Sequence, residues 1–175
     1  MRYSTDTECR DWCKQRQVAL DGRGYPTRPD ADTHHAVRDI PQSFTRLTWF
    51  CQHLERSLQP REACLLWVTD WGIWTENLHL YYRLRQSYND ARLLSEAPGH
   101  FFLAYEAADL VSFLEVGILC GWDMHLLPTV GYARAFVSHD EWVVFAADEN
   151  NPKLVDEFVE PLSAGNASGP AGGSA

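Results

Sequence analysis

The chain has 175 residues, of which 45% are hydrophobic and 22% are charged, and its formal net charge is −9. This length predicts a single domain that buries roughly 70% of the surface exposed by its unfolded form. The acidic balance argues against direct nucleic-acid binding. No uncharged apolar stretch approaches the length of about 18 residues that a membrane span needs, and the N-terminus has no apolar signal region, so we expect a cytoplasmic protein that does not bind membranes.

The first third of the chain predicts two helices and an edge strand. A helix is expected to begin at Thr5, which has the spacing of a capping box with Glu8. Residues 21–35 hold glycines, prolines and charges, and they predict a long loop. Residues 36–40 are a candidate edge strand. Residues 43–58 form the clearest amphipathic helix, with a proline close to each end.

The stretch at residues 63–69 is the centre of the predicted fold. It is apolar up to its final threonine and has no helical period, which is typical of a strand buried on both faces. Asp70 and Trp71 follow directly. Polar and aromatic groups at the end of a central strand are where an open α/β sheet usually presents a site.

Two further helices are predicted in the middle of the chain. The first covers residues 75–89, begins at a threonine N-cap and carries Arg83 and Arg85 on a basic side. Residues 93–103 contain a Pro-Gly turn followed by three apolar residues, which fit either a strand or a packed loop. Residues 107–120 predict a buried helix, and the glycine that follows is expected to end it in a left-handed cap.

The last third predicts a strand, a hairpin, a helix and a disordered tail. The strand covers residues 123–127, and the hairpin covers residues 133–147 with residues 139–141 at its turn. An Asn-Pro pair at residue 151 starts the helix. The tail at residues 163–175 has no large apolar side chain.

Together these elements predict an α/β or α+β fold in one globular domain over residues 1–162. We expect a mixed sheet of about four to five strands, with helices packed on it and a C-terminal β-hairpin. Strands that are joined through helices are candidates for parallel pairing.

Neither the cysteines nor any catalytic motif predicts a cofactor. The five cysteines lack zinc-site spacing, so free thiols are expected; they are Cys9, Cys13, Cys51, Cys64 and Cys120. Phosphate-binding loop, dinucleotide-binding, nucleophile-elbow and zinc-protease motifs are missing from the sequence. Because catalytic groups assemble in space, this does not exclude an enzyme.

One hypothesis is a metal-dependent hydrolase with imidazole and carboxylate ligands. Asp123 and His125 are two residues apart, so on a strand they would share one face. The competing interpretation is that such residues are ordinary at turns and strand ends, and that His125 forms a hydrogen bond within the core. The candidate ligands are Glu96, His100, Asp123, His125 and His139.

The first hypothesis is non-enzymatic protein binding through an acidic, tryptophan-containing surface. Residues 62–175 carry five basic and sixteen acidic side chains, a charge of −11, whereas residues 1–61 carry +2. This favours a basic protein partner that is attracted electrostatically, although a generally acidic composition is the competing explanation. Four tryptophans, Trp71, Trp74, Trp122 and Trp142, would supply aromatic anchors. The candidate partner-binding residues are Trp71, Trp74, Glu76, Asp123, His139, Asp140, Glu141 and Trp142.

In size and charge the chain is similar to immunity proteins that neutralise basic nuclease toxins. An immunity or inhibitor role is therefore the most concrete form of the binding hypothesis. The similarity covers no sequence motif, so it implies no site residue.

Overall fold

A single antiparallel sheet of seven strands organises the computed structural model, which describes residues 1–31, 34–71 and 78–164. The spatial order is β1-β4-β3-β5-β6-β7-β2, and every neighbouring pair is antiparallel. The strands are β1 (Arg2–Ser4), β2 (His34–Asp39), β3 (Ala63–Asp70), β4 (Gly99–Leu103), β5 (Asp123–Pro128), β6 (Ala133–Val137) and β7 (Trp142–Ala147).

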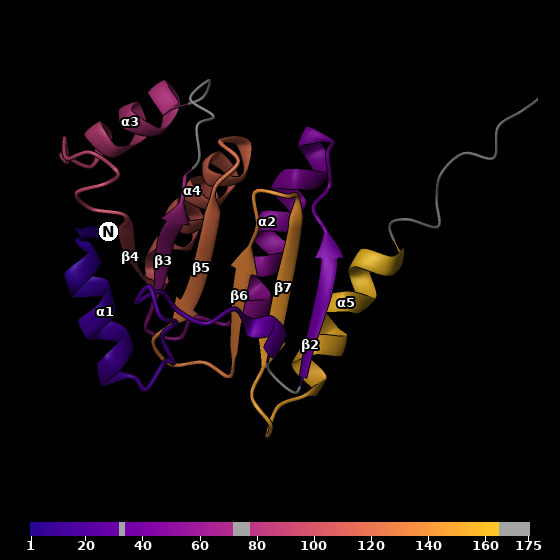
Figure 1. Cartoon of the computed structure of the whole chain (residues 1–175). Coiled ribbons are helices and arrows are strands. Elements are labelled where there is room, and N and C mark those ends of the chain that lie inside the picture. The colour runs from indigo at the N-terminus through magenta and orange to yellow at the C-terminus, as the bar shows by residue number, and fades with distance from the viewer. Residues whose placement is uncertain (32–33, 72–77, 165–175) are drawn as a thin grey trace, which may run out of the picture.

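Five α-helices accompany this sheet in the described part of the chain. They are α1 (Asp6–Gln15), α2 (Phe44–Leu58), α3 (Leu78–Ser87), α4 (Ala107–Leu119) and α5 (Lys153–Ala164). Figure 1 shows α2 and α4 behind the sheet. None of these helices is long and apolar enough to cross a membrane.

The prediction of an α/β or α+β fold with a C-terminal hairpin is confirmed, but the predicted size and mixed character of the sheet are wrong. Strands β4 and β5 are joined through α4 and point the same way, yet β3 lies between them and is antiparallel to both. Similarly, β2 and β3 are joined through α2 and are separated by three strands. These two helical connections therefore link parallel strands that are not neighbours, whereas β3 and β4, with α3 between them in the chain, are antiparallel neighbours.

Local sequence signals explain most of the element boundaries. Thr5 and Glu8 form the predicted capping box at the start of α1. Gly121 has φ +66° and its N–H donates to Ile118 O, which is the predicted left-handed end of α4. The prediction of an edge strand is also confirmed, because β2 lies at one end of the sheet.

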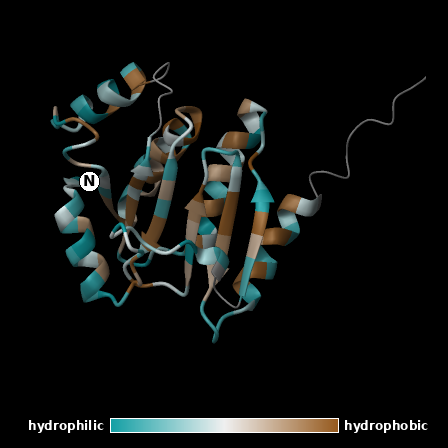
Figure 2. Cartoon of the chain, in the orientation of Figure 1, coloured by the Kyte–Doolittle hydropathy of each residue, from teal (hydrophilic) through white to brown (hydrophobic). Residues whose placement is uncertain are grey.

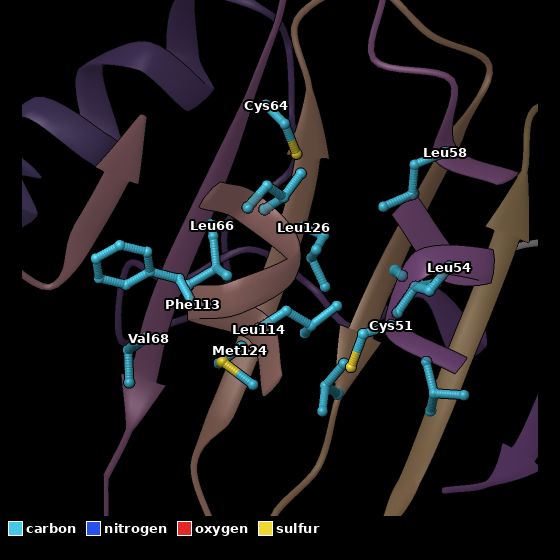
Figure 3. Close-up of a cluster of buried hydrophobic side chains, with 14 of the residues drawn as sticks. Cys51, Leu54, Leu58, Cys64, Leu66, Val68, Phe113, Leu114, Met124 and Leu126 are labelled. Atoms are coloured by element: carbon cyan, nitrogen blue, oxygen red, sulfur yellow. The ribbon is translucent and has the colours of Figure 1, made fainter. Parts of the chain in front are cut away.

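The larger part of the core lies between the sheet and helices α2 to α5. Figure 3 shows this cluster, in which side chains from α2 and α4 meet those of β3 and β5. Its labelled members are Cys51, Leu54, Leu58, Cys64, Leu66, Val68, Phe113, Leu114, Met124 and Leu126. Alternate residues of β3 belong to this cluster, and the residues between them face the other side.

The opposite face of the sheet is covered by α1 and by the loop that follows it. Figure 2 shows α1 as mostly hydrophilic, in contrast to the strands. Only its inner side is apolar, where Cys9 and Cys13 pack against Leu65 and Trp67 of β3. The indole Nε1 of Trp67 donates to Asp6 Oδ1 at 3.1 Å, which ties the start of α1 to the middle of β3.

Candidate functional site

The sheet gathers acidic residues at one end, which is the upper end in Figure 1. Strands β2 and β3 finish there, while β5 and β7 begin there, so residues distant in sequence become neighbours. Asp70 of β3 is opposite Asp123 of β5 in the register, and Asp39 of β2 is opposite Trp142 of β7. We define the acidic end as Asp39, Asp70, Asp123, His139, Asp140 and Glu141.

Four of the five carboxylates of the acidic end are exposed, and Asp123 is half-buried. The Asp140 side chain is 69% exposed. The structure thus brings together four of the predicted partner-binding residues, Asp123, His139, Asp140 and Glu141, with Trp142 beside them. Asp39 and Asp70 enlarge the cluster.

The hairpin turn at the acidic end carries a strained residue. Ser138 N–H donates to Trp142 O at 2.8 Å, and Glu141 N–H donates to Ser138 O at 3.1 Å. Glu141 occupies the left-handed region with φ +66°, a position usually given to glycine. Such a conformation costs a non-glycine residue roughly 1–2 kcal/mol. Because the turn has no glycine, Glu141 takes the left-handed position and carries the strain.

Asp123 and His139 are directly bonded. Asp123 Oδ1 accepts one bond from the His139 backbone N–H at 2.8 Å and another from His139 Nδ1 at 2.8 Å. The bond to Asp123 raises the pKa of His139 above its usual value, with the Asp123 and Asp140 charges adding to the effect. The imidazole is therefore more readily protonated here than in an unfolded chain.

A polar pocket of about 410 Å³ lies beside the acidic end. Its walls combine the start of β5 and the end of β3 with the loop after α1. We refer to it as the β5 pocket; it is lined by Asp21, Arg23, Tyr25, Pro26, Thr27, Arg28, Asp30, Thr69, Asp70, Asp123, His125 and Phe136. This volume is within the range of about 300–1,000 Å³ that is typical of ligand sites.

His125 lines the β5 pocket with a largely buried imidazole. Its residue is 3% exposed, and its ring centroid is 4.8 Å from that of Phe136. Burial, followed by the charges of Arg134 and Arg28, lowers the pKa of His125 to about 3, although Asp21 opposes this. The predicted face shared by Asp123 and His125 is confirmed, since both residues line the same pocket. The competing expectation, that His125 forms a hydrogen bond in the core, is not met in the part of the chain that the structure describes.

The tryptophans differ in their exposure. Trp142 is half-buried, with the Arg28 guanidinium 5.6 Å from its ring. Trp71 is also half-buried and packs against the main core. Trp122 is 1% exposed, so the expectation that it contributes to a binding surface is wrong. Trp74 and Glu76 lie outside the described residues.

The residues of the metal hypothesis are divided between two places. Glu96 is exposed and accepts a bond from the Leu93 N–H at 2.7 Å. His100 is fully buried, and its Nε2 shares a hydrogen bond with the Tyr81 hydroxyl, which also accepts a bond from Arg85 at 3.2 Å.

Burial, followed by the Arg85 charge, lowers the pKa of His100 to about 3. His100 therefore belongs to a buried structural network, away from Asp123, His125 and His139. Among the described residues, no group of three or more His, Cys, Asp or Glu is arranged to hold a metal ion.

The loop after α1 is the part of the site that the sequence did not predict. Its irregular composition predicted little structure, whereas Asp21 accepts bonds from the N–H groups of Arg23 and Tyr25, at 2.8 and 3.0 Å. The loop is then held to the sheet by Arg134, whose Nη1 donates to Thr27 O at 3.2 Å. The available signal was the Asp21-x-Arg23-Gly24-Tyr25 pattern, because aspartate at the start of a loop commonly bonds the backbone two residues on.

A larger hollow of about 550 Å³ lies at the opposite end of the sheet. It is lined by Arg16 of the segment after α1, Tyr132 before β6 and Glu149 after β7. None of the residues predicted for a site lies there. The β5 pocket, although smaller, is the one that adjoins the acidic end.

The chain matches no protein-family model, and neither a curated protein nor a solved structure is similar to it at a significant level. The site is therefore interpreted from its own geometry and chemistry.

Proposed function

We propose that the chain is a non-enzymatic module that binds a basic protein through the acidic end. The observation that carries the proposal is the convergence of five carboxylates from three strand ends and one turn onto one end of the sheet. A basic partner would be attracted to this concentration of negative charge.

Two further features support a binding role. Glu141 is kept in a strained conformation in which glycine would be more stable, and strain of this kind is concentrated at functional sites. Trp142, next to the turn in the sequence, offers a half-buried aromatic surface, and partly buried aromatic residues often anchor interfaces. An inhibitor or immunity role against a basic toxin is the most specific form of this proposal.

The hydrolase alternative gains no support from the geometry. Glu96 and His100 lie apart from Asp123, His125 and His139, and no group of three or more such residues is arranged to hold an ion in the part of the chain that the structure describes. We therefore retain a single candidate function.

The proposal is tested by comparing two charge-reversal variants in a capture experiment. Asp140→Lys/Glu141→Lys alters the acidic end, and Asp156→Lys/Glu157→Lys makes the same charge change at exposed positions of α5. Each immobilised protein is incubated with a lysate of the organism that encodes it. Thermal melting verifies that both variants are folded.

We expect a basic protein to be captured by the wild-type chain and by the α5 variant, and lost with the acidic-end variant or on washing at high salt. If no captured protein follows this pattern, the proposal is wrong.

A further inference from the structure

The β5 pocket has a chemistry more specific than that of the acidic surface around it. We propose that it receives one cationic side chain, an arginine or a lysine, from the basic partner. This inference rests on the proposed function, since it identifies what part of the partner would be recognised.

Most charged groups in the pocket wall already have partners. Arg23 Nε is 3.3 Å from Asp21 Oδ2, and Arg28 Nη2 is 3.4 Å from Asp30 Oδ2. These two ion pairs build the loop side of the pocket and neutralise one another. Four aspartates and two arginines line the pocket, which gives a formal charge of −2 while His125 is neutral.

Asp123 retains an oxygen atom for a ligand. Both bonds from His139 end on Oδ1, and the side chain is 19% exposed. Asp123 Oδ2 has no hydrogen-bond partner among the described residues. A carboxylate oxygen accepts strong bonds from charged N–H donors.

His125 supplies the second, independent indication of a ligand. Its residue is 3% exposed and lines the pocket, and its ring nitrogens have no hydrogen-bond partner among the described residues, although they are not completely closed off from solvent. Buried polar side chains normally have a partner, so an unpartnered imidazole facing a pocket points to an external one. A neutral imidazole offers one acceptor nitrogen. In its neutral form it adds no positive charge to those of Arg134 and Arg28, which lie close enough to act on it.

The two groups are placed so that one ligand can reach both. Asp123 and His125 are two residues apart on β5, which corresponds to about 6.6 Å along the strand. A guanidinium has five N–H donors and an ammonium has three, and neither has an acceptor. Such a group can donate to the Asp123 carboxylate and to the His125 acceptor nitrogen. An anion, in contrast, would face four carboxylates.

The mouth of the pocket is accessible to a side chain from another protein. Arg23, Arg28 and Asp70 line it and are exposed. Inside, Tyr25 and Phe136 provide aromatic walls, which suit the aliphatic part and the flat face of an arginine. The pocket thus combines an opening of mixed charge with a polar and aromatic interior.

The test uses N-acetyl-arginine methylamide and its uncharged analogue, N-acetyl-citrulline methylamide. Each is titrated into the full chain, and binding is followed by NMR shifts of the backbone amides and of the His125 imidazole. Because citrulline keeps the shape and removes the charge, we expect it to bind about tenfold or more weakly. N-acetyl-lysine methylamide distinguishes an ammonium from a guanidinium preference, and inorganic phosphate serves as the anionic probe.

Asp123→Asn removes the charge while retaining an acceptor oxygen for His139, and Asp156→Asn on α5 is the matched control. We expect Asp123→Asn to weaken binding of the arginine probe by about tenfold and Asp156→Asn to leave the affinity for this probe unchanged. Equal binding of arginine and citrulline, shifts located away from the pocket, or preferential phosphate binding would overturn the inference. These comparisons in the wild-type chain hold even if Asp123→Asn does not fold.

The two proposals can fail separately. If partner capture depends on Asp140 and Glu141 but the arginine and lysine probes do not bind, the pocket assignment alone is wrong. If a cationic probe binds while partner capture is insensitive to both residues, the acidic-end proposal is wrong and the pocket remains a cation site.

Discussion

Acid should destabilise this fold well above the pH at which carboxylates titrate, because two imidazoles are buried in their neutral form. His100 and His125 are 0% and 3% exposed, and burial is the largest cause lowering the pKa of each to about 3. A histidine in an unfolded chain titrates near a pKa of about 6.5. Between these values the unfolded chain binds protons that the folded protein does not, so the free energy of unfolding falls as the pH falls.

The size of the effect follows from this difference. Lowering the pH from 7.5 to 5 should cost about 2 kcal/mol for each of the two histidines, and about 4 kcal/mol together. This loss of unfolding free energy is set by the histidine pKa in the unfolded chain. It hardly changes with the pKa in the folded protein, provided that the folded value stays below about 4. Such a loss is a large share of the 5–15 kcal/mol that is typical of folded domains.

His139 acts in the opposite direction. The bond to Asp123 raises its pKa in the folded state, so its stabilising contribution is complete below the unfolded pKa and is lost as the pH rises through the folded one. The buried histidines are therefore best isolated by a variant. His125→Phe removes one titrating group and retains an aromatic ring beside Phe136.

The assay is urea unfolding of the wild type and of His125→Phe at pH 7.5 and pH 5. We predict that the variant loses about 2 kcal/mol less than the wild type between the two pH values. An equal loss in both proteins would refute the argument, because it would show that His125 is protonated equally in the folded and unfolded states.

Three further changes test the packing. Leu114→Ala should lower the free energy of unfolding by about 2–5 kcal/mol, measured by chemical denaturation, since Leu114 is fully buried; a change near zero would contradict the placement of the core. Glu141→Gly should raise stability by about 1 kcal/mol by relieving the left-handed strain, while weakening partner capture; a lower melting temperature would argue against strain. Gly99→Ala should destabilise by about 1–3 kcal/mol or more, because the added Cβ would lie 2.2 Å from Cys9 Sγ. Adding Cys9→Ala should recover part of that loss, and strictly additive effects in the double-mutant cycle would contradict the contact.

The elements that could be predicted are those with a strong local pattern. The amphipathic period of α2, the capping box of α1 and the apolar run of β3 each specify a local structure without help from the rest of the chain. The pairing of strands could not be predicted in the same way. Whether β4 lies beside β5 or beside β3 depends on how the chain crosses the sheet. Strand β1 has only three residues, too few to show a pattern.

Side-chain environments were also only partly predictable. Arg83 and Arg85 suggest a basic side of a helix, yet Arg85 is fully buried, over the ring of Tyr3 at 4.3 Å and bonded to Ala97 O at 3.1 Å. Tertiary contacts, and not the helical pattern, determine that Arg85 is buried, since Arg83 and Arg85 belong to the same helical segment.

The candidate site, too, could be predicted from the sequence only in part. The strand period alone places Asp123 and His125 on one face. The bond between Asp123 and His139 instead requires the register of β5 against β6, with Met124 opposite Val137, because that register brings the hairpin turn to the start of β5. The loop after α1 forms one wall of the β5 pocket, and no sequence pattern predicts the bonds that hold this loop to the sheet.

The most direct test of the central claim is the dissociation constant of the captured basic protein, measured at low and at moderate salt. We predict that Asp140→Lys/Glu141→Lys weakens binding roughly tenfold or more at low salt and reduces its salt dependence. The Asp156→Lys/Glu157→Lys control should bind like the wild type. Equal affinity and equal salt dependence for all three proteins would contradict the claim that the acidic end is the binding surface.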